Sequence, residues 1–562
     1  MIKIVQVFPA IAILLQLVGI LDHSLWSPDE PRVAEISREM AVSGDYLMPH
    51  FLNRPFLEKP PLYFATAGVF YRVFGTTCEG VGRFASVIFA IGTLLVVFFG
   101  TRAIYTEQTA GLSTLILATS FKFFEISHKM MVDIALCFFI TAALFSFALA
   151  YKDKSSWGYK LFWISLALAF MTKGLIGIGI PLAVVILFAL WQEDFSLINP
   201  HELSTLTTKD ENMLGPRETS VPGNRSLIPN PYLHIKKMWV LPGILLIALV
   251  MIAWGWVLYT RGGVDFLRTF YFYNQFGRFF HGGSYLGGHI RPFYYYLTTV
   301  WTDAAPWFLL LIPAFISTRR LEDTTRFMYA WFLAGLIILS ISSTKRGLYF
   351  LPMYPAMAVI IAQWMSSIIE KGAVGWQKLF LWFVMGLILL AGLLAPFAYV
   401  KLGGLWWIAF VMLGLTIGIF WYIWVHSRKP FPLVILISWA LLLLLWTPLL
   451  IPRIDQEKDY KPFFEDMGKV VSDKHVIGCQ LTETVEALCL FYGGVYVEDI
   501  EDRDIFAEII REGDLQHVLI LPSRVDAGIK ELMGSRGKCV LKVDGRARRK
   551  IELWRIGNKQ NY

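Results

Sequence analysis

Residues 25–64, LWSPDEPRVAEISREMAVSGDYLMPHFLNRPFLEKPPLYF, follow one apolar segment and precede a long series of others. A charged stretch in that position lies at a membrane surface, and this one holds an acidic pair, Asp29-Glu30, and an acid–base pair, Glu58-Lys59. Prolines flank both pairs, and proline fixes its own backbone and biases the preceding residue toward extended geometry. A solvated loop between spans is the ordinary interpretation of such a stretch. The proline bracketing and the mixed charge instead favour a site whose side chains are held with little ordering cost.

The middle of this stretch predicts a helix that lies along the membrane. Over residues 32–40, the apolar Val33, Ile36 and Met40 recur at helical spacing. The charged residues between them fall on the opposite side of the helix, which is typical of an amphipathic interfacial helix.

The composition indicates a membrane protein. The chain has 562 residues, of which 56% are hydrophobic and 15% aromatic, and its mean hydropathy is +0.54. Soluble domains do not sustain such values over this length. The formal charge of +8 does not indicate nucleic-acid binding, because lysines and arginines at span ends produce the same surplus. The five cysteines show no metal-type spacing, and their odd number argues against a full disulfide framework.

About 13 apolar segments are long enough, or nearly so, to cross a bilayer, which takes roughly 17–25 helical residues. They are residues 5–21, 81–103, 108–124, 132–151, 159–174, 175–191, 239–260, 293–317, 327–342, 347–367, 376–399, 404–425 and 431–451. Residues 5–21 have no convincing cleavage site after them and are expected to be a retained first span. The short segment 61–75 is expected to lie at the interface. Residues 1–451 are therefore predicted to form an all-α polytopic membrane domain.

Basic residues in the short loops set the expected orientation. The loops concerned carry Lys152 and Lys154, Lys236 and Lys237, Arg319 and Arg320, and Arg428 and Lys429. All four pairs are cytoplasmic if Met1 is cytoplasmic and the number of spans is odd. The loop 22–80 and everything after Pro452 then face the outer side. The polar stretch 192–231 is expected to be a flexible cytoplasmic loop.

The composition changes at residue 452. From there, helical patterns alternate with short strand-like runs at 475–479, 495–498, 517–521, 539–543 and 550–554. This alternation predicts a small extracytoplasmic α/β domain over 452–562. It contains no glycine-rich phosphate loop, and no chemistry is predicted for it.

Further polar clusters fall on the same side of the membrane as the opening stretch. Asp133 stands where a span begins, and ionisable residues at membrane depth are functional candidates. The run 269–296 mixes polar residues with aromatics and glycine pairs, and these polar residues are Asn274, Arg278, His281, His289 and Arg291. An aromatic belt does not explain two histidines and two arginines, so a binding loop is expected. Residues 342–355 add Lys345, Arg346, Tyr349 and Tyr354, whereas Lys173 alone is expected to snorkel.

These residues are expected to form one pocket that holds both carboxylates and cations. Cations at a membrane boundary suit an anionic phosphate headgroup, which arginine binds bidentately and lysine as a point charge. Carboxylates in the same cleft suit a general base or a divalent-metal ligand. A lipid-linked phosphosugar uses both kinds of group.

Four ordered motifs resemble those of the membrane-embedded GT-C glycosyltransferases. They are DEPRVAEISREM (29–40), FLEKPPLYF (56–64), GRFFHGGSYLGGHIRPFYYY (277–296) and STKRGLYFLPMYPA (343–356). The chain is most similar to the aminoarabinose transferases and their relatives, alongside the protein O-mannosyltransferases. The resemblance covers about residues 1–360, and it implies the superfamily without fixing the sugar.

The resemblance implies roles for individual residues. The expected catalytic carboxylates are Asp29, Glu30 and Asp133. The groups expected to bind the lipid phosphate are Lys59, Arg278, Lys345, Arg346 and Tyr349. The expected ligands of a divalent metal ion, the one cofactor implied, are Glu58 and His289. Arg346-Gly347 stands where the closest relatives are expected to have Leu-Pro, so the specificity for donor or acceptor is expected to differ.

The sequence therefore predicts an inverting glycosyltransferase of the bacterial cytoplasmic membrane, active on the periplasmic side. It would move a sugar from a polyprenyl-phosphate carrier to a lipid A-like glycolipid, another glycan or a protein, with membrane lipids around it and no nucleic-acid partner. Lys59 and Arg278 would stabilise the departing phosphate, and Asp29 would deprotonate or orient the acceptor. Two alternatives stay open. One is a transporter or flippase for an anionic polyprenyl-phosphate lipid, and the other is a membrane anchor for a functional tail.

Overall fold

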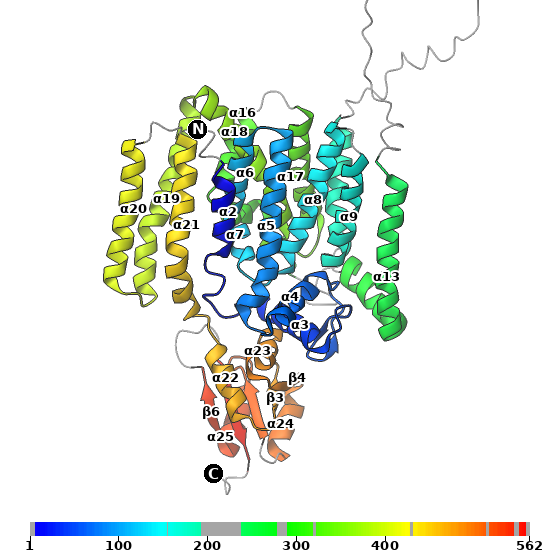
Figure 1. Cartoon of the computed structure of the whole chain (residues 1–562). Coiled ribbons are helices and arrows are strands. Elements are labelled where there is room, and N and C mark those ends of the chain that lie inside the picture. Colours follow the sequence, from blue (N-terminus) through cyan, green and yellow to red (C-terminus); the bar gives the residue numbers. More distant parts are fainter. Residues whose placement is uncertain are drawn as a thin grey trace, which may run out of the picture.

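The protein consists of a helical bundle with a smaller unit of strands and helices attached to one end (Figure 1). The computed structural model describes residues 6–557 apart from 154–155, 193–237, 278–288, 318–321, 427–430, 513–515 and 544–549. Two short helices, α3 (Glu30–Ser43) and α4 (Leu62–Phe74), lie at the end of the bundle that carries the smaller unit.

The predicted all-α membrane domain is confirmed. Its bundle helices are α2 (Phe8–Leu17), α5 (Glu79–Ile104), α6 (Glu107–Ala118), α7 (Phe121–Ser127), α8 (Val132–Asp153), α9 (Ser156–Lys173), α10 (Leu175–Gln192), α13 (Val240–Leu267), α15 (Tyr295–Asp303), α16 (Phe308–Ser317), α17 (Asp323–Ile341), α18 (Tyr354–Lys371), α19 (Gly375–Lys401), α20 (Trp406–His426) and α21 (Phe431–Asp455). Every predicted apolar segment thus lies on at least one helix.

The predicted number of about 13 spans is not confirmed. Among the described residues, eight helices are long and apolar enough to cross a membrane, or up to nine if a bent pair is one span. Helices α2 and α6 have only 10 and 12 residues, whereas a span takes roughly 17 or more. The protein is therefore a multi-pass membrane protein with several helices that enter the bundle without meeting the length of a full span.

One predicted span is broken. The sequence predicts a single helix over 293–317, but α15 and α16 meet at an angle of 108°. Pro306 lies between them, and proline lacks a backbone donor and biases the residue before it away from the helical conformation. Residues 289–291, which precede α15, contact the segment that follows α17 through an antiparallel bridge between Ile290 and Thr344.

Small residues allow the bundle helices to approach closely, as is common in membranes. A Cβ atom on Gly100 of α5 would overlap the ring of Phe145 on α8. A Cβ atom on Gly335 of α17 would likewise overlap Met353, which ends the short 3-10 helix η4 (Gly347–Met353). This packing fixes η4, whose first turn lies beside the candidate site.

The segment from α3 to α4, which we call the cap, contains the predicted helix, but Glu35 and Glu39 of its expected polar face are buried. Helix α3 has proline in its first turn and ends at Gly44, whose φ of 73° suits glycine. A two-residue hairpin, β1 (His50–Phe51) with β2 (Arg54–Pro55), leads on to α4. The loop between β2 and α4 carries Glu58 and Lys59, and both of these side chains are half-buried.

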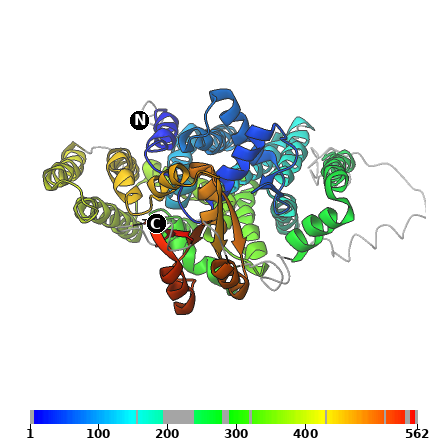
Figure 2. The same ribbon diagram turned by 90° about the horizontal axis from the view of Figure 1, so that it is seen from below.

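Helix α13 continues into a π-helix, η2 (Arg268–Gly277), after a kink at Gly262 and Gly263. The kink turns η2 back toward the bundle, where Asn274 Nδ2 donates a hydrogen bond of 2.9 Å to the carbonyl of Leu57. Figure 2 shows α13 and α20 at opposite ends of the bundle in the view from below. The kinked helix therefore contacts the cap through η2.

The C-terminal unit has the predicted α/β character. Its elements are α22 (Lys461–Val470), β3 (His475–Cys479), α23 (Glu483–Gly493), β4 (Tyr496–Ile500), α24 (Arg503–Glu512), β5 (Gln516–Ile520), α25 (Ala527–Arg536), β6 (Gly537–Lys542) and β7 (Glu552–Ile556). The strand order is β4-β3-β5-β7-β6. Strand β3 is parallel to both β4 and β5, and β7 is antiparallel to both β5 and β6. Helix α21 runs past the expected domain boundary at 451 before this unit begins.

Candidate active site

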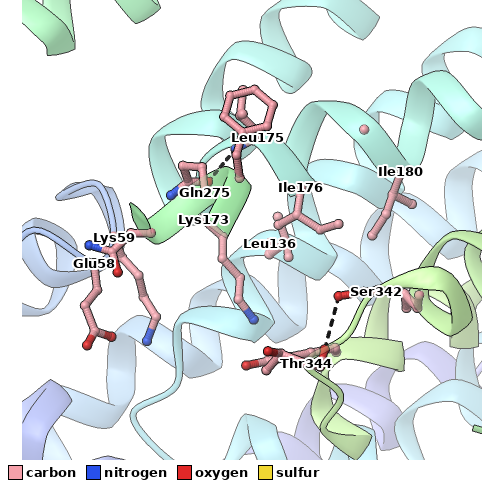
Figure 3. A pocket seen from close by; sticks show the side chains of 15 residues that line it. Glu58, Lys59, Leu136, Lys173, Leu175, Ile176, Ile180, Gln275, Ser342 and Thr344 are labelled. Carbon is pink, nitrogen blue, oxygen red and sulfur yellow. Dashed lines mark hydrogen bonds between the residues drawn. The ribbon is translucent and has the colours of Figure 1, made fainter. Parts of the chain in front are cut away.

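Two cavities lie between the cap and the bundle. The first, which we call the apolar cavity, has a volume of about 310 Å³. Aliphatic side chains of α8, α10 and α17 form one part of its wall, and polar side chains of the cap, of η2 and of residues 342–344 form another. Figure 3 shows Glu58 and Lys59 on one side of it, Leu136 and Ile176 on the other, and Lys173 between them. Two lysines thus lie beside the aliphatic part of this cavity.

Lys59 extends in the same direction as Lys173 in Figure 3. The pKa of Lys59 is lowered to about 8, first by burial and then by the positive charges of Arg32 and Lys173, while Glu58 and Asp133 oppose this shift. A cation in such surroundings gains from an anionic partner, because a low-polarity environment strengthens the attraction between charges. The apolar cavity is therefore suited to an anion that carries an apolar tail.

Lys173 is held by two neighbours. Its ammonium forms an ion pair with Asp133 and lies 4.0 Å from the ring centre of Tyr349. Asp133 is buried at the first turn of α8, where it orients Lys173. The sequence predicts a snorkelling role for Lys173 and a catalytic role for Asp133. The structure corrects the first of these roles, and the pairing makes Asp133 a support for the cavity's second cation.

The second cavity, which we call the charged cavity, has a volume of about 340 Å³. Cationic side chains from three segments line it, and they are Lys122, Lys129, Arg291, Lys345 and Arg346. Lys122 and Lys129 share Glu125 in ion pairs of 2.8 and 2.6 Å. His289 and Trp26 also lie on its wall. The wall also holds the carboxylates Asp29, Glu30 and Glu125. The five cations outnumber these three carboxylates, and this surplus of positive charge suits an anionic ligand.

Lys345 is the most deeply buried cation of the charged cavity, with 3% of its surface exposed. Its ammonium donates to the backbone carbonyls of Ser342 and, at 3.2 Å, of Arg291. Burial lowers the pKa of Lys345. These carbonyls fix the ammonium in place at the wall of the cavity.

Asp29 and Arg346 form a bidentate ion pair at the wall of the charged cavity. Burial alone would raise the pKa of Asp29, but the Arg346 guanidinium, with Lys59 and Arg32, lowers it to about 2. A carboxylate with such a low pKa is a weak base at neutral pH. Asp29 is therefore suited to orienting Arg346 rather than to removing a proton.

The predicted single pocket is thus divided into two. Ser342, Thr344 and Tyr349 line the apolar cavity, whereas Lys345 and Arg346 line the charged one. The chain passes between the cavities from the bridge at Thr344 into η4, so neighbouring residues face different spaces. Lys345 and Arg346 therefore do not share a cavity with Lys59, contrary to the expected single phosphate site.

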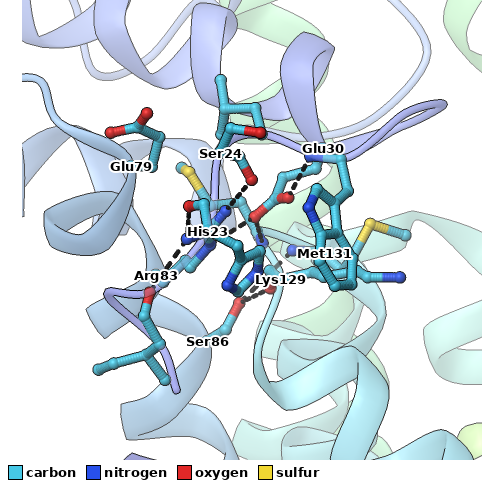
Figure 4. Close-up of polar contacts among 12 residues, drawn as sticks. His23, Ser24, Glu30, Glu79, Arg83, Ser86, Lys129 and Met131 are labelled. Atoms are coloured by element: carbon cyan, nitrogen blue, oxygen red, sulfur yellow. Dashed lines mark hydrogen bonds and ion pairs between the residues drawn. The ribbon is translucent and has the colours of Figure 1, made fainter. Parts of the chain in front are cut away.

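Glu30 has a structural setting (Figure 4). Its carboxylate pairs with Arg83 at 2.7 Å, with both side chains fully buried, and accepts hydrogen bonds from the amides of Trp26 and Met130. Arg83 also donates to three backbone carbonyls, those of Ile20, His23 and Ser24. This network holds the chain that leads to Asp29, so we assign Glu30 a structural role in place of the predicted catalytic one.

The expected metal ligands do not come together. Glu58 lines the apolar cavity and lies 3.8 Å from Arg32, whereas His289 lines the charged cavity. Within the described ranges, no group of three or more His, Cys, Asp and Glu side chains is arranged to hold a metal ion. The two expected ligands therefore do not form one site among the described residues, and no step below is routed through a metal.

Arg278 lies outside the described residues, as does His281. The residues that the sequence interpretation missed are Lys173, Arg83, Lys122 and Lys129. The sequence could have identified Arg83, because an arginine inside a predicted span is a functional candidate. It could not have identified the role of Lys173, because the partner Asp133 lies 40 residues away in the chain.

Comparisons with known proteins agree with this arrangement. The family described as dolichyl-phosphate-mannose-protein mannosyltransferase matches residues 4–267. An undecaprenyl phosphate-alpha-4-amino-4-deoxy-L-arabinose arabinosyl transferase 2 of Proteus mirabilis is 28% identical over 350 residues, covering 60% of this chain and 55% of that protein. The corresponding transferase of Pectobacterium atrosepticum is also 28% identical, covering 63% and 58%. The chain thus spans little more than half the length of these curated relatives.

The fold is shared with a solved structure over almost the whole chain. The crystal structure of ArnT from Cupriavidus metallidurans bound to undecaprenyl phosphate has a TM-score of 0.75 at 19% identity, with 98% of each chain covered. The same protein in the apo state has a TM-score of 0.74. The expected resemblance to the GT-C polyprenyl-phosphate-sugar glycosyltransferases is confirmed in fold and, over the first half of the chain, in sequence.

Proposed function

We propose that this chain, which has the fold of a GT-C polyprenyl-phosphate-sugar glycosyltransferase, is an integral membrane glycosyltransferase. It moves a sugar from a polyprenyl-phosphate carrier to an acceptor at the outer face of a bacterial cytoplasmic membrane. The observation that carries the proposal is the pair of adjoining cavities. One combines an aliphatic wall with two lysines, and the other is lined by five lysines and arginines. Asp29 and Arg346 form an ion pair at the wall of the second cavity.

The apolar cavity is the proposed donor site. The polyprenyl chain is apolar and suits the aliphatic lining, and the phosphate suits Lys59 and Lys173. Tyr349 lies beside Lys173 and is the proposed third contact, while Lys345 and Arg346 are reassigned to the acceptor side. The curated relatives in Proteus and Pectobacterium are named for an undecaprenyl-phosphate donor, which supports this class of donor here.

The reaction breaks the bond between the anomeric carbon and the phosphate oxygen and forms one to the acceptor oxygen from the opposite face. The bonding electron pair leaves with the polyprenyl phosphate, so negative charge grows on that group in the transition state. Lys59 and Lys173 are already fixed beside the cavity, and preorganised charge of this kind is a large source of rate enhancement. Arg278 stays a predicted further contact of the phosphate.

The charged cavity is the proposed acceptor site, and its chemistry favours an acceptor with ionised groups. A hydroxyl acceptor needs a base to take its proton, and Asp29, with a pKa of about 2, is poorly suited to that task. A phosphate acceptor is already ionised and needs only to be oriented. Arg346 can bind a phosphate bidentately while Asp29 holds its guanidinium in place. A phosphorylated lipid A-like glycolipid is therefore favoured over a protein hydroxyl.

The catalytic loop and the C-terminal unit are proposed to face the periplasm. Both lie at the same end of the bundle (Figure 1), as the basic loops of the sequence predict. A flippase for an anionic lipid is not favoured, because the fold and the named relatives are those of glycosyltransferases. The two functions differ in one observable, which is whether the sugar leaves its carrier.

The test uses purified full-length protein in detergent with radiolabelled undecaprenyl-phosphate sugars, aminoarabinose first, and lipid A as the acceptor. Label is expected to reach lipid A. Asp29→Ala and Lys59→Ala are expected to abolish transfer, whereas Lys530→Ala, at an exposed lysine of α25, keeps the wild-type rate. Near-normal turnover by Asp29→Ala or Lys59→Ala would contradict the site. Donor binding without transfer to any acceptor would favour the flippase.

A divalent metal stays a prediction of the sequence resemblance alone. Glu58 is its expected ligand, although it lies beside Arg32. Loss of transfer in a chelator, restored by added Mg²⁺ or Mn²⁺ in the wild type and not in Glu58→Gln, would support a metal bound there. Unchanged transfer in the chelator would contradict it.

A further inference from the structure

Hydrogen bonds join the C-terminal α/β unit to the segment that carries Asp29. Thr484 of α23 donates a hydrogen bond of 2.9 Å to the carbonyl of Pro28. The hydroxyl of Tyr492, also on α23, accepts a hydrogen bond of 3.0 Å from the amide of Leu25. At the end of α21, Asp455 accepts from Ser24 and from the indole of Trp26. These bonds tie residues 24–28 to parts of the chain more than 400 residues away.

Arg32 forms ion pairs that join α3, the loop before α4 and the C-terminal unit. It lies 3.7 Å from Asp29 and 3.8 Å from Glu58, and its short contact of 2.5 Å is to Glu483, the first residue of α23. The Arg32 guanidinium also lies 5.7 Å from the ring centre of Phe56. Arg32 is thus within a small displacement of both carboxylates at the proposed site.

The distances show which carboxylate holds Arg32. Charge-assisted hydrogen bonds have lengths of about 2.7–2.9 Å, and the separations from Asp29 and Glu58 are well beyond that. Glu483 therefore draws the guanidinium toward the C-terminal unit. Without this partner, Arg32 is free to close on either carboxylate, and Asp29 already carries one guanidinium from Arg346.

We propose that Glu483 is a positioning residue for the transfer reaction, which holds Arg32 away from Asp29 and Glu58. The proposal rests on the proposed function and deepens it, because it gives the C-terminal unit a part in the reaction. Glu483 touches neither cavity, so it acts only through Arg32. The unit would thus support activity by keeping Asp29 available to Arg346 and Glu58 in place beside Lys59.

The positioning role depends on the charge of Glu483. Glu483 lies 2.5 Å from the Arg32 guanidinium, whereas Asp29 and Glu58 lie 3.7 and 3.8 Å from it. Loss of the Glu483 charge therefore releases a cation beside two carboxylates of the proposed site. Removal of that cation is then expected to restore activity, which a loosened C-terminal unit would not explain.

The experiment compares Glu483→Gln with Glu508→Gln in the full-length protein in detergent, using the transfer assay. Glu508 is an exposed glutamate of α24 and serves as the matched control. Exposed ion pairs contribute modestly, so we expect kcat/KM of Glu483→Gln to fall by about fivefold. Glu508→Gln is expected to match the wild type.

Two further variants make the test decisive. Glu483→Asp keeps the charge and is expected to recover most of the activity. The double variant Arg32→Met/Glu483→Gln removes the freed cation together with its partner, so it is expected to be more active than Glu483→Gln alone. A double variant no better than the single one, or Glu483→Gln indistinguishable from Glu508→Gln, would overturn the positioning role.

The failure of this proposal is distinguishable from failure of the proposed function. If the wild-type protein transfers no sugar from any donor, the proposed function is wrong, and Glu483 has no reaction to support. If the wild type transfers sugar and Glu483→Gln does so equally well, the function stands and the positioning role is wrong. Thermal unfolding of each variant, measured in the same detergent, separates either result from a loss of folded protein.

Discussion

Lys59 carries its charge in an unfavourable place, beside the aliphatic part of the apolar cavity and near the cations Arg32 and Lys173. Its surroundings lower the pKa of Lys59 to about 8. A lysine with this pKa is mostly charged at neutral pH and mostly neutral one unit above 8. A change of pH across this range therefore changes the positive charge that Lys59 offers to a phosphate in the apolar cavity.

The first prediction concerns this pH dependence. The profile of kcat/KM reports the pKa values of the free enzyme, so kcat/KM is expected to decline as the pH rises through about 8, because the neutral amine no longer attracts the donor phosphate. Lys59→Arg keeps its charge at these pH values, and its alkaline limb is expected to move to higher pH. A limb at the same pH in wild type and Lys59→Arg would assign the titration to another group.

Some residues of the candidate site can be predicted from the sequence, and others cannot. Asp29, Glu58 and Lys59 could be predicted, because proline brackets and charge at a membrane surface mark them locally. The pairing of Lys173 with Asp133 could not, because it depends on how α8 and α9 pack. Glu483 is the extreme case, since it is an ordinary exposed glutamate until the fold brings it to Arg32.

At the scale of elements, the segment before α3 depends on a buried ion pair. Arg83 of α5 holds Glu30 and donates to the carbonyls of residues 20, 23 and 24. Removing one partner of a buried pair leaves an uncompensated charge in a poorly hydrated place, which costs about 3–5 kcal/mol. The stability of this segment is therefore expected to depend strongly on Arg83.

The second prediction follows from this pair. Arg83→Met is expected to lower the free energy of unfolding by about 3–5 kcal/mol, seen as a lower thermal midpoint in detergent. Glu30→Gln/Arg83→Met leaves no unpaired carboxylate and is expected to recover part of that loss. Arg102→Met, at an exposed arginine near the other end of α5, is the control. An Arg83→Met midpoint equal to that of Arg102→Met would contradict a structural role for the pair.

The third prediction concerns how α9, α10 and η2 meet at Gly174. Its φ is 73°, and a Cβ atom there would overlap Gln275, whose side chain accepts a hydrogen bond of 3.0 Å from the amide of Leu175. Gly174→Ala is expected to displace η2 from the donor cavity and to raise the KM for the donor about fivefold, which corresponds to ~1 kcal/mol. Steady-state kinetics with varied donor measures this change.

Gly372→Ala is the matched control for Gly174→Ala. Gly372 has a φ of 81° with no other atom within 4 Å of its added Cβ, so it introduces similar backbone strain away from the cavity. The donor KM of Gly372→Ala is expected to equal that of the wild type. Equal changes in both variants would indicate general strain and would contradict a special role for the contact with η2.

The elements themselves were largely predictable, because apolar segments of span length leave few alternatives and the alternation after residue 452 is typical of an α/β unit. Three features were not. The 108° bend between α15 and α16 could be predicted only by giving Pro306 more weight than the apolar character of residues 293–317. The π-helix η2 follows from a glycine kink that periodicity does not detect, and the lengths of α2 and α6 fall short of the apolar runs that contain them.

At the scale of the whole molecule, the bundle and the C-terminal unit meet around one short segment, residues 24–32. Arg83 holds this segment from within the bundle, and α23 holds it from the other side. Asp29 lies between these two supports and contacts Arg346 at the charged cavity. This segment thus forms part of the boundary between the bundle and the C-terminal unit beside the charged cavity.

The account predicts that the acceptor reacts through an ionised group. The charged cavity is lined by five lysines and arginines, and the low pKa of Asp29 leaves it a weak base. A site built to bind polar groups rejects an analogue that lacks them, because its own groups are then left unpaired. The acceptor's phosphate, rather than its sugar or lipid, is therefore expected to decide whether transfer occurs.

The most direct measurement compares transfer from one undecaprenyl-phosphate sugar to lipid A and to the same lipid A with its phosphates removed enzymatically. The account predicts that wild-type protein prefers the phosphorylated acceptor by at least about a hundredfold, and that the preference shrinks in Arg346→Met. Equal transfer to both acceptors, or transfer to a hydroxyl of the dephosphorylated lipid, would contradict it.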